Sequence, residues 1–139
     1  NVKKITGQLS FPLRIDKNNN LEQAAKEILK HSDFITLHVP AQKGYVIGQK
    51  QLDLMRKGAG IINAARGGVI DEVALIEALK SNKIAFAGLD TFEEEPTPAV
   101  QILMNNKISL TPHIGAATNE AQDRIGEELA SQIISLMSN

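Results

Sequence analysis

Residues 60–71 read GIINAARGGVID, an apolar segment that ends abruptly at an arginine between small residues. The small neighbours of Arg66 leave its guanidinium open to a ligand. The same pattern occurs twice more along the chain, with Asp90 after residues 85–89 and His113 after residues 108–112. Three successive apolar segments therefore each end in a side chain that can bind or exchange protons.

Short apolar runs alternate with segments whose apolar residues have helical spacing. We expect strands over residues 34–37, 60–63, 84–89 and 108–111, and helices over 21–31, 49–57, from Asp71 to about Asn82, from Thr97-Pro98 to about Asn105, and for about twenty residues after Thr118. This alternation is typical of an α/β fold with a parallel sheet. Because open α/β sheets bind ligands at the carboxyl edge of their strands, we expect an arginine, a carboxylate and a histidine to meet in one site.

Composition limits the classes of protein to consider. The chain has 139 residues, 42% of them hydrophobic, which suits one soluble domain. A net charge of -1 argues against non-specific nucleic-acid binding. The absence of cysteine and the spacing of the three histidines argue against a metal site. No apolar run approaches the roughly 18 residues of a membrane helix, so we expect a cytoplasmic protein without a membrane partner.

Three motifs resemble those of the NAD-dependent D-2-hydroxyacid dehydrogenases. Residues 63–72 are similar to the arginine motif of that family, residues 88–92 with Glu95-Pro96 to its glutamate motif, and residues 111–116 to its histidine motif, in the same order and spacing. The resemblance covers roughly residues 20–138. It implies a partial doubly wound, Rossmann-like NAD-binding domain, in which residues 1–139 are the C-terminal portion. The first strand, the glycine-rich loop and the substrate domain would lie outside this chain.

The resemblance also implies roles for individual residues. His113 would be the catalytic acid/base, Glu95 would orient its imidazole and favour the protonated form, and Arg66 would hold the substrate carboxylate. The coenzyme NAD would lie against Val39, Pro40, Ala64, Arg66, Asp90, His113, Gly115 and Ala116. Taken without the resemblance, a lone arginine or histidine at a strand end is more often structural than catalytic.

The implied reaction is hydride transfer between NAD and a small D-2-hydroxyacid. Within the family the motifs most resemble the branch that converts D-3-phosphoglycerate to 3-phosphohydroxypyruvate in serine biosynthesis, although glyoxylate, hydroxypyruvate and D-lactate remain alternative substrates. A non-catalytic NAD(H)-binding sensor or corepressor-type protein of the same fold is the alternative of a different class. The residues of this chain alone are expected to be inactive, and the resemblance implies a homodimer formed through the coenzyme domains.

Several further residues have structural interpretations. We expect His31 and His38 to be structural histidines, and Glu93 and Glu94 to be solvated loop charges. Residues 1–16 suggest extended structure. In the last helix, one apolar stripe needs a covering partner, which can be this sheet, a second domain or another subunit: Ala121, Ile125, Leu129, Ile133 and Leu136.

Overall fold

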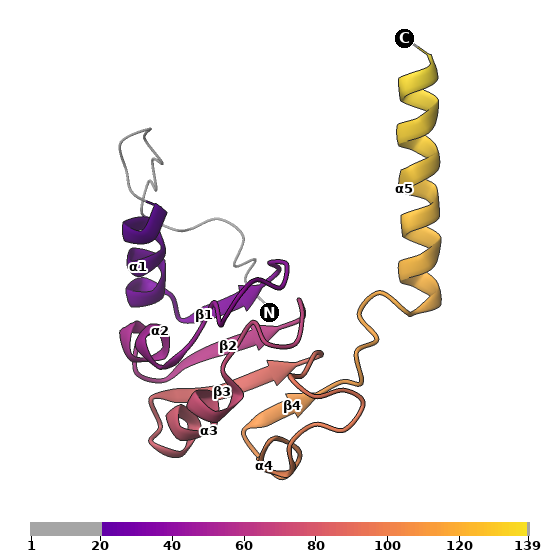
Figure 1. Ribbon diagram of the computed structural model, residues 1–139. Helices are drawn as coiled ribbons and strands as arrows, with labels where there is room; N and C mark the ends of the chain where they lie inside the picture. The colour runs from indigo at the N-terminus through magenta and orange to yellow at the C-terminus, as the bar shows by residue number, and fades with distance from the viewer. Residues whose placement is uncertain (1–20, 139) are drawn as a thin grey trace, which may run out of the picture.

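A computed structural model describes residues 21–138 of the chain, so the expectation for residues 1–16 lies outside the described residues. Its centre is a sheet of four parallel strands in sequence order (Figure 1): β1 (Phe34–Leu37), β2 (Ala59–Asn63), β3 (Ile84–Leu89) and β4 (Ile108–Leu110). Helices connect consecutive strands, as parallel pairing requires. The structure confirms the expected α/β fold with a parallel sheet.

The five helices of the described residues begin largely where the sequence places them. They are α1 (Leu21–His31), α2 (Gln49–Leu54), α3 (Glu72–Lys80), α4 (Val100–Leu103) and α5 (Asn119–Met137). Asp71 caps α3 by accepting a hydrogen bond from the Ala74 amide at 3.0 Å. Thr118 caps α5 in the same way through the Ala121 amide at 3.2 Å. Both caps satisfy amides that the first turn of a helix leaves without partners.

Two helices are shorter than the sequence predicts. The expected helix over residues 49–57 ends at Leu54, because Met55 takes an extended conformation and buries its side chain in the core. The expected start at Thr97-Pro98 is also wrong, since α4 is a single turn that begins after Ala99. Ile102 in this turn is completely buried. Packing of Ile102, rather than the capping sequence, sets where the turn forms.

The core lies between one face of the sheet and the helices α2, α3 and α4. On that face Ile61, Ala87 and Leu89 are at most 3% exposed. Helical side chains cover them and are themselves completely buried, namely Leu52, Leu75, Leu79 and Ile102. This packing fixes β2 and β3, the two strands that carry Arg66 and Asp90 at their ends.

The opposite face of the sheet carries exposed aromatic side chains. Phe34 and Phe86 are 49% and 39% exposed, and their ring centroids lie 5.7 Å apart. Gly60 lies between them in the strand register. A Cβ at this glycine would overlap the ring of Phe86. Glycine here permits the close approach of the ring to the backbone, and a larger residue would displace the Phe86 side chain.

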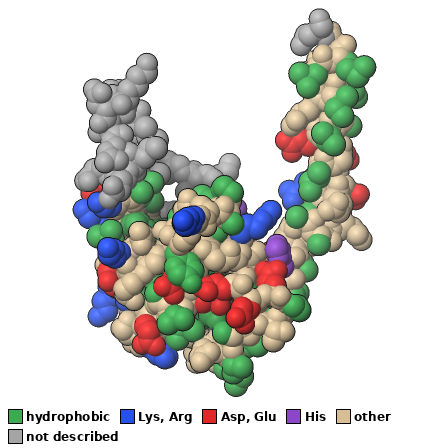
Figure 2. Space-filling model, in the orientation of Figure 1, with side chains coloured by type: hydrophobic (Ala, Val, Ile, Leu, Met, Phe, Trp, Pro, Cys, Tyr) green, Lys and Arg blue, Asp and Glu red, His purple; other side chains and the backbone are tan. Residues whose placement is uncertain are grey.

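Helix α5 extends away from the sheet (Figure 1). Figure 2 shows hydrophobic side chains along its surface. Of the predicted stripe, Ala121 is buried at the start of the helix, whereas the following members are between 47% and 79% exposed: Ile125, Leu129, Ile133 and Leu136. The stripe does not cover this sheet in the described structure. No helix within residues 21–138 is long and apolar enough to cross a membrane.

Candidate active site

The carboxyl ends of β2, β3 and β4 lie side by side at one edge of the sheet. Asn63, Leu89 and Leu110 occupy the same level across the three strands. The segments that follow them carry Arg66, the acidic loop and His113 at that edge. The parallel register therefore brings together the three polar segments that the sequence identified.

Glu95 and His113 form a hydrogen-bonded pair between two of these segments. Nδ1 of His113 lies 2.9 Å from Oε2 of Glu95, and the Phe92 amide donates to the other carboxylate oxygen at 3.1 Å. The hydrogen bond to His113 is the main cause that lowers the pKa of Glu95, followed by the bond from the Phe92 amide. Glu95 is therefore held ionised with one oxygen anchored to backbone and the other facing the imidazole.

The carboxylate of Asp90 holds the histidine segment in place. It accepts hydrogen bonds from Oγ1 of Thr111 at 2.6 Å, from the Ile114 amide at 3.0 Å and from the Gly115 amide at 3.1 Å. Partial burial acts to raise the pKa of Asp90, but these three bonds outweigh it, and the pKa is lowered overall. A Cβ at Gly115 would lie 2.9 Å from Oδ2 of Asp90, so a larger residue would disturb this arrangement.

His113 itself has a left-handed backbone, with φ of 55°. Such a conformation is uncommon for residues other than glycine and persists only where surrounding contacts enforce it. The bonds from the neighbouring Ile114 and Gly115 amides to Asp90 are those contacts. Asp90, which the resemblance places among the coenzyme contacts, thus also orients the histidine segment in this structure.

Arg66 lies on a turn that closes directly after β2. The buried side chain of Asn63 accepts from the Ala65 amide at 3.1 Å and donates to the Arg66 carbonyl at 3.0 Å. The guanidinium donates to the Ala65 carbonyl at 2.6 Å and forms no ion pair with a carboxylate of residues 21–138. Its charge is therefore available to an anionic ligand.

A cavity of about 320 Å³ opens between the ends of β1 and β2. It is lined by His38, Val39, Pro40, Ala41, Ala64, Ala65 and Arg66. The predicted coenzyme residues Val39, Pro40, Ala64 and Arg66 are therefore neighbours, while Asp90, His113, Gly115 and Ala116 belong to a second group around the histidine segment. Small apolar walls beside a cation fit a coenzyme that carries anionic groups and must approach the backbone closely.

Two other histidines have the local bonds expected of structural residues. Nε2 of His38 lies 2.9 Å from Oγ1 of Thr36 on the same strand end. His31 lies in the last turn of α1, with Nε2 3.3 Å from a carboxylate oxygen of Glu27. Neither contact involves Glu95 or Arg66.

Glu93 is an exposed loop charge, as expected, but it also makes structural contacts that were not expected. Although exposed, its carboxylate accepts hydrogen bonds from the Glu72 amide at 2.9 Å and from the Tyr45 hydroxyl at 3.1 Å. The amide belongs to the first residue of α3, where a helix offers unpaired donors and attracts negative charge. The bond joins residues 21 positions apart, so local sequence rules do not reveal it. Glu94 is also exposed, as expected.

Comparison with known proteins identifies the family. The family of the NAD binding domain of D-isomer specific 2-hydroxyacid dehydrogenases matches residues 10–115. The chain is 51% identical over 109 residues to the D-3-phosphoglycerate dehydrogenase of Methanocaldococcus jannaschii, covering 77% of this chain and 21% of that protein. It is 49% identical over 109 residues to the glyoxylate reductase of Thermococcus litoralis, covering 77% and 33%.

A solved structure shows the same fold. The D-lactate dehydrogenase of Lactobacillus jensenii, crystallised with NAD+, matches with a TM-score of 0.63 and 38% identity over 67% of this chain and 33% of that one. The chain thus spans between about a fifth and a third of the length of these relatives. The match confirms the expected coenzyme class and the Rossmann-like fold. The chain belongs to the family of NAD-binding domains of the D-isomer specific 2-hydroxyacid dehydrogenases.

Proposed function

We propose that the protein containing these residues transfers a hydride between NAD and a D-2-hydroxyacid, with D-3-phosphoglycerate and 3-phosphohydroxypyruvate as the substrate pair in serine biosynthesis. The observation that carries the proposal is the His113–Glu95 pair, with 2.9 Å between Nδ1 and Oε2, at the same sheet edge as Arg66. An acid/base pair at the same sheet edge as a cation that forms no ion pair within the described residues suits a substrate with a reacting hydroxyl next to a carboxylate.

His113 is the proposed proton-transfer group. Its Nδ1 faces Glu95, which leaves Nε2 to take the hydroxyl proton of the substrate during oxidation and to return it to the carbonyl oxygen during reduction. The bond to Glu95 keeps the ring in one orientation and stabilises the imidazolium that oxidation produces. When bound, NAD accepts or donates the hydride that moves to or from C2 of the substrate.

Arg66 is the proposed site for the substrate carboxylate. A guanidinium can bind both carboxylate oxygens at once, whereas a lysine ammonium acts as a point charge. Binding in this manner would fix the direction of the C2–H bond. Val39, Pro40 and Ala64 around the 320 Å³ cavity, together with Gly115 and Ala116, are the proposed coenzyme contacts.

We further propose that residues 1–139 are the C-terminal portion of the coenzyme domain and that a separate substrate domain completes each subunit. The full protein would be a cytoplasmic homodimer. The proposal is supported by the share of the relatives that the chain spans, 21% and 33%. The exposed apolar residues of α5 suit a surface that another domain or subunit covers.

The test is oxidation of NADH by the full-length protein with 3-phosphohydroxypyruvate, compared with hydroxypyruvate, glyoxylate and pyruvate. We expect the highest kcat/KM with the phosphorylated acid. Preference for an unphosphorylated acid would mean that the proposed mechanism is correct and the proposed substrate is wrong. Tight NADH binding without turnover of any of the four 2-oxoacids would indicate a non-catalytic NAD(H)-binding sensor or corepressor-type protein instead of an enzyme.

A further inference from the structure

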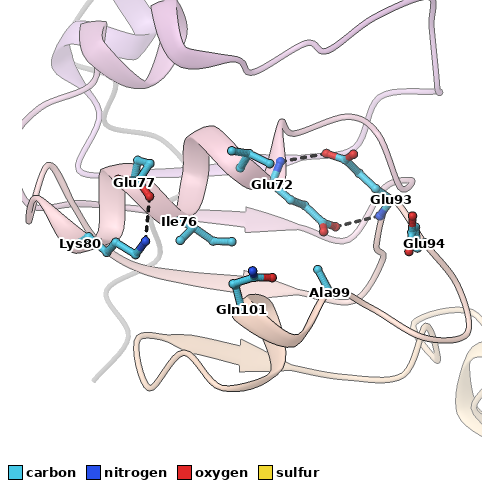
Figure 3. A pocket seen from close by; sticks show the side chains of 9 residues that line it. Glu72, Ile76, Glu77, Lys80, Glu93, Glu94, Ala99 and Gln101 are labelled. Atoms are coloured by element: carbon cyan, nitrogen blue, oxygen red, sulfur yellow. Dashed lines mark hydrogen bonds and ion pairs between the residues drawn. The ribbon is translucent and has the colours of Figure 1, made fainter.

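Glu72 and Glu93 hold each other through two reciprocal hydrogen bonds. The Glu72 amide donates to Oε1 of Glu93 at 2.9 Å, and the Glu93 amide donates to Oε1 of Glu72 at 2.8 Å. Figure 3 shows the two side chains lying side by side between the start of α3 and the loop after β3, each carboxylate next to the amide of the other residue. The Tyr45 hydroxyl adds a third bond, to Oε2 of Glu93 at 3.1 Å. We call these two carboxylates and their mutual bonds the Glu72–Glu93 clamp.

The clamp is a costly way to join two segments. Glu72 is only 8% exposed, and burial is the main cause that raises its pKa, although the hydrogen bond from the Glu93 amide opposes this effect. The negative charges of Glu93 and Glu94 raise the pKa further. Apolar side chains would be cheaper to bury in such a place. The Glu93 amide compensates part of this burial and ties the Glu72 carboxylate to the loop after β3.

Both segments joined by the clamp carry candidate active-site residues. Glu93 is two residues before Glu95, in a loop where the Phe92 amide already anchors the Glu95 carboxylate at 3.1 Å. Glu72 is the first residue of α3 and follows the Arg66–Val69 turn after two residues. At Gly67 that turn touches the Phe92 carbonyl so closely that a Cβ would overlap it. A loop that moved away from α3 would thus change the position of Glu95 relative to both His113 and Arg66.

We propose that Glu93, together with Glu72, is a positioning residue that holds Glu95 against His113 and in register with the Arg66 turn. This inference rests on the proposed dehydrogenase function, because it assigns Glu93 to the same proton-transfer pair. Glu93 touches neither the reacting atoms nor the coenzyme site in the cavity beside Arg66. It acts only through the loop that carries Glu95.

The first test is kinetic and uses the full-length protein. Glu93→Ala should lower kcat about tenfold, since a displacement near 1 Å can cost up to about 100-fold, while the Kd of NADH stays within about twofold. Glu94→Ala removes a neighbouring charge with no clamp contact and should leave kcat unchanged. Glu93→Gln keeps one oxygen for the Glu72 amide and should restore most of kcat. Equal kcat values for Glu93→Ala and Glu94→Ala would overturn the proposal.

A double-mutant cycle separates positioning from general structural damage. If Glu93 acts through Glu95, then Glu93→Ala should lower kcat little further in a Glu95→Gln background. Full additivity of the two substitutions would contradict the proposal. Tyr45→Phe removes only the third hydrogen bond from an exposed side chain and should lower kcat in the same direction by about twofold. If Glu93→Ala does not fold, the Tyr45→Phe variant still tests the clamp.

The second test does not depend on turnover. In full-length protein labelled with ¹⁵N-histidine, the Nδ1–H signal of His113 reports its hydrogen bond to Glu95. Glu93→Ala should broaden or shift this signal, and Glu94→Ala should not. If wild-type protein reduces no 2-oxoacid, the proposed function fails, and this signal still decides whether the clamp positions the pair. An identical signal in wild type and Glu93→Ala would reject the positioning role.

Discussion

Replacing Gly67 with alanine would force apart the two backbone segments on which the candidate site depends. A Cβ at this position would overlap the carbonyl oxygen of Phe92. To reach an ordinary contact distance, the two segments must move apart by about 1.5 Å. Overpacking of this kind costs about 1–3 kcal/mol. Because the contact is with backbone, no side-chain rotation relieves it. The displacement moves Arg66 relative to the loop that carries Glu95, and we expect kcat to fall about 100-fold.

The assay combines steady-state reduction of the preferred 2-oxoacid with urea unfolding of the full-length protein. Two control substitutions at other glycines distinguish the steric clash at Gly67 from the general cost of replacing a glycine. Gly68 has φ of 73° and open space around its Cβ position, so Gly68→Ala should cost about 1 kcal/mol of stability and retain most of kcat. Gly126 lies in α5 with open space, and Gly126→Ala should stabilise the helix by up to about 1 kcal/mol. Wild-type stability and turnover in Gly67→Ala would refute the packing argument.

Three further predictions concern the site and its support. His113→Ala should lower kcat by at least about 100-fold with little change in the Kd of NADH. Arg66→Lys should raise the KM of the 2-oxoacid by a larger factor than it raises the Kd of NADH. Steady-state kinetics measure kcat and KM, and titration with NADH measures the Kd. The pKa of Asp90 is lower in the folded protein than its ordinary value near 4 in the unfolded chain. Its ionised carboxylate therefore stabilises the fold at pH values above about 4, and this stabilisation is lost as the pH falls through the pKa of the folded protein. The difference in unfolding free energy between wild type and Asp90→Asn should therefore shrink as the pH falls from about 6 to about 2 in urea titrations. Lys107 donates to the Leu79 carbonyl at 2.6 Å at the end of α3, and Lys107→Met should cost about 1 kcal/mol by urea unfolding.

Each of these predictions has its own contrary result. Unchanged kinetics in both His113→Ala and Arg66→Lys would remove these residues from the site. A constant difference between wild type and Asp90→Asn across the pH range would mean that the Asp90 bonds do not depend on its charge. For Lys107 the matched control is Lys80→Met, which breaks only an exposed pair with Glu77. Equal stability losses in the two lysine variants would argue against the capping bond.

Local sequence rules placed the strands within about one residue of their observed ends, because short apolar runs are bounded by polar or glycine residues. They also placed the caps at Asp71 and Thr118, where the acceptor and the donor are three residues apart. The alternation of strands and helices was enough to predict that Arg66 and His113 share one sheet edge.

What the sequence alone did not reveal depends on contacts between distant segments. The end of α2 follows from the burial of Met55, and the start of α4 follows from the burial of Ile102. Both are tertiary effects that override local preference. The bonds between Glu72 and Glu93 join positions that carry no special spacing. Their only sequence signal is a glutamate at the first position of α3, which also suits a solvated helix start.

The most direct measurement of the central claim is transfer of label from NADH carrying deuterium at both C4 positions of its nicotinamide ring to the 2-oxoacid preferred by the full-length protein. The account predicts deuterium at C2 of the product and a product of D configuration, and the same labelled D product should form at least about 100-fold more slowly in His113→Ala. Absence of deuterium at C2, or a product of L configuration, would contradict the proposed hydride transfer by this site.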